Sequence, residues 1–206
     1  MDFTSDCRRC PRLVRYRKTL EKQFPHYYNA PVPMLGSQHK GLLIVGLAPG
    51  LHGANASGRV FTGDQSGDLL FATLQGSGFS NLAISRSLDD GMVLNDCAIT
   101  NAVKCVPPAN RPTAREVMCC RPFLQAEIEK LQPRVIVALG RIAHEAVLKV
   151  FGLVLSQHAF SHGKHHHLIE GMVLIDSYHC SRYNVQTGRL TATLLQRVFV
   201  DARGLL

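Results

Sequence analysis

The sequence has no apolar run long enough to span a membrane, and its first ten residues are polar, without the apolar segment of a secretion signal. It also has no internal repeat and no stretch whose composition marks a linker. These absences argue against a membrane-spanning, secreted or repeat protein. We therefore expect one domain over residues 1–206, located in the cytoplasm, associated with the nucleoid if the protein is bacterial, and without a membrane partner.

Tryptophan is absent and only 18% of the residues are charged, whereas 46% are hydrophobic. A chain of 206 residues with this balance can fill a core, so disorder is not expected. The little charge that is present is one-sided, because 15 acidic residues stand against 23 lysines and arginines and leave a net charge of +8. Such an excess makes a polyanion the first partner to consider, although a basic surface that only aids solubility would look the same.

Seven cysteines are many for a chain of this length in a reducing compartment, where cysteines are more often metal ligands, catalytic groups or buried thiols than disulfides. Cys7 and Cys10 form a C-x-x-C pair that can place two thiolates on one metal. Cys105 and Cys120 can complete the site if the N-terminus lies against the loop after Cys105. Four thiolates suit either zinc or a [4Fe–4S] cluster. Two alternatives remain: Cys119 competes for the fourth position, and all of these cysteines could be unrelated buried thiols.

The stretch 42–64, LLIVGLAPGLHGANASGRVFTGD, combines a buried strand with a glycine-rich loop. An apolar run that stops at such a loop is how a central parallel strand delivers its C-terminal end to a binding crevice. The loop offers Arg59 as a cation, Phe61 as an aromatic face and Asp64 as a carboxylate. It matches neither the dinucleotide pattern G-x-G-x-x-G nor the phosphate pattern G-x-x-x-x-G-K-[ST], so an ordinary strand-to-helix turn remains the alternative.

The rest of the chain alternates apolar strands with helices. Further strands are predicted within 92–100, at 134–139 and at 172–176, and helices at 13–24, 66–74, 113–132, 140–151 and 191–202. Ser66 and Thr113 are the expected N-caps of two helices, with Glu116 at the capping-box position of the second. This alternation predicts an α/β fold with a mostly parallel, four-stranded sheet covered by helices on both faces. The loops after the first, second and fourth strands would then share one crevice.

Polar side chains follow two of the predicted strands. Asn101 offers a donor and an acceptor, which is what reading the edge of a base requires, although an Asx turn would also use it. His179 could donate a hydrogen bond to an oxyanion, although a lone histidine is more often structural. The histidine-rich run 158–167 is interpreted as a solvated loop rather than a metal site, because no carboxylate or cysteine is spaced to complete one.

Several motifs occur in order along the chain: GLAPG at 46–50, HGAN-x-x-GR-x-FTGD at 52–64, TNAVKC at 100–105, a cysteine before RPFL at 121–124, and SYHCSRYN-x-QTGRLT at 177–191. Together they resemble the uracil-DNA glycosylase superfamily, and within it the iron–sulfur branch called family five or type b. The resemblance implies a three-layer α/β/α sandwich that removes uracil, with hypoxanthine and other deaminated bases as further candidates, and leaves an abasic site in DNA. It also implies a [4Fe–4S] cluster held by Cys7, Cys10, Cys105 and Cys120.

The resemblance further implies roles for individual residues. The extruded base would stack on Phe61 and hydrogen-bond to Asn101, while His179 stabilises the negative charge that grows on it. Asp64 would orient the attacking water, because the acidic residue that the neighbouring family four has in this loop is Leu47 here. The remaining contacts are to the base at Gly46, Leu47 and Ala48, to DNA at Arg59, Arg182, Tyr183 and Asn184, and to phosphates at Lys104, Arg111 and Arg115.

Segment 181–189 is interpreted as a wedge that fills the gap left by the extruded nucleotide, with a polar surface loop as the alternative. The expected partner is double-stranded DNA, with single-stranded DNA as a second candidate, bound by a monomer. Two other functions remain open. A cluster-bearing nucleic-acid-binding or electron-transfer protein without hydrolysis would not need Asp64, and a nucleotide-binding enzyme would use the glycine-rich loop for phosphate.

Overall fold

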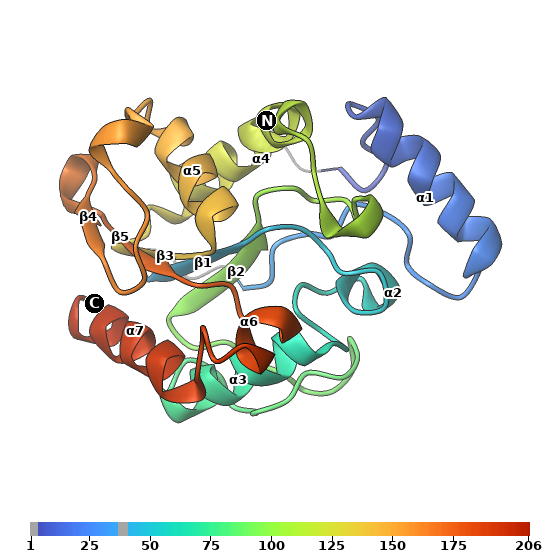
Figure 1. The fold of residues 1–206 in the computed structure, drawn as a ribbon. Helices are drawn as coiled ribbons and strands as arrows, with labels where there is room; N and C mark the ends of the chain where they lie inside the picture. Colours follow the sequence, from blue (N-terminus) through green and yellow to red (C-terminus); the bar gives the residue numbers. More distant parts are fainter. Residues whose placement is uncertain (1–3, 37–40) are drawn as a thin grey trace.

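A computed structural model describes residues 4–36 and 41–206 and shows a five-stranded sheet flanked by helices (Figure 1). The strands are β1 (Leu42–Gly46), β2 (Cys97–Asn101), β3 (Val135–Leu139), β4 (His165–His167) and β5 (Val173–Ser177). The α-helices are α1 (Pro11–Gln23), α2 (Ala54–Ser57), α3 (Gln65–Gly76), α4 (Ala114–Leu131), α5 (Arg141–Val150), α6 (Arg182–Gln186) and α7 (Ala192–Gly204). Short 3₁₀ turns lie at η1 (Pro108–Asn110), η2 (Leu155–Gln157) and η3 (Ile169–Gly171). Within these residues, no helix is both long and apolar enough to cross a membrane.

The sheet has the order β2-β1-β3-β5-β4, in which the first four strands are parallel and β4 runs antiparallel to β5. Every residue of the four parallel strands is buried, which is typical of strands covered on both faces. The register pairs Gly46 with Asn101 and Leu139 with Ser177 at the C-terminal ends. The loops after four different strands therefore leave the same edge of the sheet.

Alternate strand residues point to opposite faces and build two cores. On one face, Leu42 and Ile44 pack with apolar residues of α3 and α7. On the other face, Leu43 and Val45 pack with apolar residues of α4 and α5. Figure 1 shows these two helix pairs on either side of the sheet. The three-layer α/β/α arrangement predicted from the sequence is confirmed.

Helix α1 lies at one end of the molecule and is fixed to the start of α4 (Figure 1). Arg12 makes a two-pronged ion pair with Glu116, in which both N···O distances are 2.7 Å. Glu116 also accepts the backbone N–H of Thr113 and donates its own backbone N–H to Thr113 Oγ1, which confirms the predicted capping box. This contact brings the N-terminal segment, with its two cysteines, against the segment 105–120.

The structure corrects the sequence-based prediction at three places. The sheet has five strands rather than four, because residues 165–167 of the histidine-rich run add an edge strand with alternating burial. Helix α3 is capped by Asp64 rather than by Ser66. Segment 181–189, interpreted as a wedge and without a predicted helix, contains helix α6 with Ser181 as its N-cap. The other predicted strands and helices are confirmed to within a few residues at their ends.

Candidate functional site

A cavity of about 760 Å³ opens at the C-terminal edge of the sheet. It is lined by the loops that follow β1, β2, β3 and β5, together with residues 109–111 and Phe160. A cavity of this size is typical of small-molecule sites. The predicted shared crevice is confirmed, and the predicted site residues in its lining are Leu47, Ala48, Phe61, Asp64, Asn101, Arg111, His179, Tyr183 and Asn184.

Asn101 ends β2 and is only 2% exposed. Its Oδ1 has no hydrogen-bond partner among the described residues, which is costly for a buried acceptor and points to a ligand that donates a hydrogen bond. Gly46, its neighbour on β1, makes room for it, because a Cβ there would lie 2.4 Å from Asn101 Oδ1 and 2.6 Å from Phe61 Cζ. Gly46 therefore lies behind the cavity, where it allows Asn101 and Phe61 to approach each other, and not in the lining itself.

Phe61 forms one aromatic wall of the cavity. Its φ of +53° lies in the left-handed region, which a bulky residue rarely adopts. The start of α3 packs tightly on this backbone, since a Cβ at Gly67 would lie 1.7 Å from the carbonyl oxygen of Phe61. The ring lies at 29° to that of His179, with their centroids 6.1 Å apart. Backbone strain held by its surroundings is common at functional sites, and here it fixes an aromatic ring in the cavity wall.

Asp64 serves helix α3 and the cavity at once. Its Oδ1 accepts the backbone N–H of Gly67 at 3.0 Å and so caps the helix. Its Oδ2 faces the glycine-rich loop, where a Cβ would lie 2.9 Å away at Gly50 and 2.2 Å away at Gly53. Burial raises the pKa of Asp64, and backbone N–H groups from the first turn of α3 oppose that rise. Larger residues at either glycine would displace the carboxylate from this position.

His179 follows β5 and belongs to the lining of the same cavity. Burial lowers its pKa to about 4, so the imidazole is neutral at physiological pH. Its backbone carbonyl accepts a hydrogen bond from Asn184 Nδ2 at 2.8 Å. Gly140, after β3, allows the two loops to approach, because a Cβ there would lie 3.3 Å from His179 Cβ. A neutral imidazole in this position can donate one hydrogen bond without bringing a positive charge.

Helix α6 lies at the rim of the cavity. Tyr183 is 71% exposed and yet belongs to the lining. Asn184 is turned inward, toward the carbonyl of His179. Arg182 is exposed and lies outside the lining. The segment thus presents an exposed aromatic ring beside the cavity, which is compatible with the wedge interpretation.

Two cations that were expected to contact DNA are buried instead. Arg59 is 6% exposed, donates from Nε to Thr62 Oγ1 at 3.0 Å and forms an ion pair with Asp90. Burial by itself would raise the pKa of Asp90, but the Arg59 guanidinium and three backbone N–H groups hold it well below its usual range. Lys104 is 1% exposed, and its Nζ lies 2.6 Å from Glu127 Oε2. The structure therefore does not support DNA contacts by Arg59 or Lys104, which brace the fold through buried carboxylates.

Arg111, which was expected to contact phosphates, belongs to the cavity lining. The lining also contains Arg141 and Arg189, which the sequence analysis did not select individually and which bring further positive charge to the cavity. Arg141 lies in the segment that follows β3. The sequence could have predicted that this segment lines the cavity, because all parallel strands of the sheet end at the same edge. Phe160 and Tyr178 add two aromatic rings to the cavity lining, and Arg189 Cζ lies 4.4 Å from the ring centroid of Tyr178. The position of Phe160 required the structure, since it depends on how the histidine-rich run folds back on the sheet.

The four predicted cysteine ligands come together beyond the C-terminal end of β2, beside residues of α1 and α4. Cys7, Cys10, Cys105 and Cys120 line one small cavity with apolar walls. The sulfur of Cys120 accepts a backbone N–H at 3.3 Å. Cys119 also reaches this cavity, but it is half-buried and lies outside the buried apolar cluster that includes Cys105 and Cys120. These differences favour Cys120 over Cys119 as the fourth member of the group.

This donor set fits a group that binds thiolates. Burial raises the pKa of Cys10 and of Cys105 to about 12, so both are thiols unless a metal takes them as thiolates. Arg17 is buried close to Cys105, and its Nη2 donates to the carbonyl of Cys7 at 2.8 Å. Its Nε has no hydrogen-bond partner in the described part of the chain. A buried guanidinium with an unpaired N–H beside four sulfurs suits an anionic metal cluster.

The fold and the cavity define an α/β protein with an aromatic-walled site at the C-terminal edge of a mostly parallel sheet. Residues 33–203 match the family model of the uracil DNA glycosylase superfamily, and the chain belongs to that superfamily. Within it, the similarity to type-5 uracil-DNA glycosylases extends over nearly the whole chain.

Three relatives illustrate this similarity. The type-5 uracil-DNA glycosylase of Mycobacterium leprae is 45% identical over 98% of this chain and 92% of its own length. The type-5 enzyme of Pyrobaculum aerophilum is 45% identical over 96% of this chain and 89% of its own length. The type-5 enzyme of Thermus thermophilus is 44% identical over 97% of this chain and 93% of its own length. The resemblance to this branch that the motifs indicated is confirmed.

Proposed function

We propose that the protein is a uracil-DNA glycosylase, which hydrolyses the N-glycosidic bond of uracil in DNA and leaves an abasic site. The observation that carries the proposal is the similarity to type-5 uracil-DNA glycosylases over nearly the whole length of a chain whose Asp64, Asn101 and His179 line one cavity. A protein that only binds nucleic acid or transfers electrons would have no need of this set. That alternative is not favoured.

Asn101 supports recognition of the base. Its Oδ1, which has no partner in the described part of the chain, can accept a hydrogen bond, and the ring N–H at position 3 of uracil is a suitable donor. The corresponding nitrogen of cytosine is an acceptor and would leave Oδ1 unpaired, which disfavours the normal base. Phe61 offers its ring for stacking, with Leu47 and Ala48 in the same lining. Hypoxanthine also carries a ring N–H beside a carbonyl, so it and related deaminated bases are further candidate substrates.

The charges that develop during cleavage match the two titratable residues of the cavity. As the bond between the base nitrogen and C1′ breaks, its electron pair leaves with the base, and the sugar becomes positive. His179, as a neutral donor, stabilises the negative charge on the base oxygen. Asp64, as a carboxylate, stabilises the sugar and orients a water. The oxygen of that water bonds to C1′, and its proton passes to Asp64.

The rim of the cavity supports binding of duplex DNA. A base must leave the stack before it can enter the cavity, which costs roughly a few kcal/mol. The exposed ring of Tyr183, next to Arg182, would fill the gap that remains. Arg111, Arg141 and Arg189 would contact phosphates. Single-stranded DNA avoids the cost of extrusion and is the second candidate substrate. Every residue in this scheme belongs to one chain, so we propose that a monomer acts.

We also propose a [4Fe–4S] cluster with the ligands Cys7, Cys10, Cys105 and Cys120. The shared cavity, its apolar walls and the buried Arg17 support this assignment. When bound, the cluster would supply a cross-link between the N-terminal segment and the segment 105–120. Because Arg111 lies in that segment and also lines the active-site cavity, the cross-link would position a phosphate contact.

The deciding experiment incubates the purified protein with labelled duplexes that contain one uracil opposite adenine or guanine, followed by alkaline cleavage at abasic sites. We expect cleavage at the uracil and none when thymine occupies the same place. Asp64→Asn is the matched control, because asparagine retains the oxygen that caps α3 and loses only the charge. Wild-type protein that binds the uracil duplex without producing abasic sites would overturn the proposal in favour of a binding protein.

A further inference from the structure

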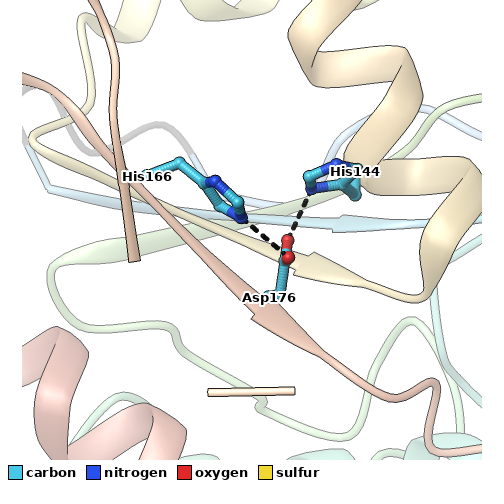
Figure 2. Close-up of side chains that lie close together, drawn as sticks. All are labelled: His144, His166 and Asp176. Atoms are coloured by element: carbon cyan, nitrogen blue, oxygen red, sulfur yellow. Dashed lines mark hydrogen bonds and ion pairs between the residues drawn. The ribbon is translucent and has the colours of Figure 1, made fainter. Parts of the chain in front are cut away.

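Three buried side chains from three elements meet outside the lining of the active-site cavity (Figure 2). His144 comes from α5, His166 from the edge strand β4 and Asp176 from β5. Their exposed fractions are 2%, 4% and 0%. One ligand atom from each lies within 4.8 Å of the others. This group shares no residue with the cysteine site and has no part in the proposed reaction.

Asp176 is a fully buried carboxylate whose side-chain partners in the described part of the chain are two imidazoles. Oδ1 lies 2.6 Å from Nδ1 of His144, and Oδ2 lies 2.9 Å from Nε2 of His166, as the dashed lines in Figure 2 mark. Oδ2 also accepts the backbone N–H of Ser161 at 3.1 Å. No lysine or arginine among the described residues forms an ion pair with Asp176. A buried carboxylate needs a compensating positive charge, so a cation is required at the imidazoles.

The second nitrogen of His144 indicates where that cation lies. Nε2 is 2.8 Å from the backbone carbonyl oxygen of His158, a position that only an N–H can occupy. In the neutral ring the lone pair is then on Nδ1, which faces Oδ1 of Asp176. Two acceptors at this distance need a proton or a metal ion between them. Imidazoles held by a backbone carbonyl and carboxylates that accept a further hydrogen bond are the arrangement found around metal ions.

We propose that His144, His166 and Asp176 form a site for a divalent transition-metal ion, with zinc as the best match. Two imidazole nitrogens and one carboxylate oxygen are a zinc donor set, and a water would complete four-coordination. Zinc–ligand bonds near 2 Å set neighbouring donors roughly 3.3 Å apart. The two carboxylate–imidazole contacts must therefore open by less than about 1 Å, and no pair of ligand atoms, all within 4.8 Å of one another, must close by more than about 1.5 Å. His166 can supply this movement, because β4 is a three-residue strand at the edge of the sheet.

The role of such an ion would be structural. It would tie α5, β4 and β5 together, and the loop 158–163 is held to two of its ligands by the hydrogen bonds of His158 O to His144 and of Ser161 N–H to Asp176. This loop builds part of the cavity wall. Phe160 packs edge-on against the ring of His144, with centroids 5.5 Å apart, and lines the cavity. His162 stacks on Tyr178 with centroids 5.0 Å apart and a 9° angle between the rings. The ion would therefore stiffen the Phe160–Tyr178 wall without contacting the substrate.

The test is a calorimetric titration of the chelator-treated, full-length protein with Zn²⁺. We expect wild type to bind about one equivalent that His166→Gln does not bind. His165→Gln, an exposed neighbour on the same strand, is the matched control and should retain it. Zinc that enters the cysteine site does not respond to His166→Gln, so the two sites are distinguished whether or not the iron–sulfur cluster forms.

Two further measurements apply to wild-type protein alone. Displacement of the proton between His144 and Asp176 should make the binding heat depend on the ionisation enthalpy of the buffer. X-ray absorption at the zinc edge should show nitrogen and oxygen ligands. Sulfur ligands alone, or zinc uptake that is the same in wild type and His166→Gln, would overturn the proposal. Either result would leave a shared proton as the cation beside Asp176.

Discussion

Replacing Asp64 by asparagine separates the two functions of this side chain. Asparagine keeps the oxygen that accepts the N–H of Gly67, and asparagine and aspartate cap helices about equally well. The carboxylate that stabilises the sugar and orients the water is lost. Because general acid–base catalysis contributes roughly 10²- to 10⁴-fold, we expect the single-turnover rate of uracil release to fall by roughly two to four orders of magnitude. Duplex binding should not change.

Although Asp64→Asn should lower the rate, it should not lower the stability of the folded protein. Burial raises the pKa of Asp64, so the folded state disfavours its charged form. A group with a raised folded-state pKa contributes stability below its unfolded pKa and loses that contribution as the pH rises through the folded-state pKa. The charge therefore costs stability at neutral pH. Asp64→Asn should be at least as stable as wild type there, and this advantage should shrink as the pH falls toward the unfolded pKa.

Rapid-quench assays with excess protein measure the chemical step, and thermal unfolding at two pH values measures stability. Asp64→Ala removes the charge and the cap, and loss of the cap should cost about 1 kcal/mol. Thr191→Ala removes the cap of α7 outside the cavity lining, so it should lose similar stability and keep the rate. A near-wild-type rate for Asp64→Asn would refute the reasoning and leave Asp64 with the capping role alone.

Three further predictions follow from the site. Because burial lowers the pKa of His179 to about 4, NMR should show no ring titration near 6.5, and the protein should lose stability as the pH falls from 6.5 toward 4; a ring that titrates near 6.5 would contradict the neutral-donor role. Cys120→Ala should lose the brown colour and the iron, whereas Cys119→Ala should retain both, and the reverse result in iron analysis would exchange the ligand assignment. Tyr183→Ala should slow excision most from a U·A pair and least from single-stranded uracil, whereas equal losses on both would argue against a wedge.

The sheet, its helices and the position of the crevice could be predicted from local patterns. Buried parallel strands are continuous apolar runs, as in Leu42–Gly46 and Val135–Leu139. The capping box of Thr113 and Glu116 is a hydrogen-bond pattern between residues three apart, so it is visible in the sequence. Strand β4 was missed because three histidines carry no apolar signal, and the strand forms only by pairing with β5.

The partners of charged side chains could not be predicted in the same way. Arg59 meets Asp90, and Lys104 meets Glu127, across separations of 31 and 23 residues. In the sequence, each of these cations is indistinguishable from one that faces phosphate. The histidine-rich run was interpreted as solvated because no nearby carboxylate completes a metal site, yet the fold brings Asp176 to His166 and His144.

The sequence by itself determined the order of strands and helices, and through it the edge of the sheet at which Asn101, Asp64 and His179 would meet. Backbone geometry sets these periodicities over a few residues, so they can be recognised locally. Only the tertiary structure decided the state of each group: the Oδ1 of Asn101 left without a partner among the described residues, the helix cap made by Asp64 and the neutral ring of His179. Burial and the choice of partner decide these properties, and both depend on residues that are distant in the chain and become neighbours only when the layers pack.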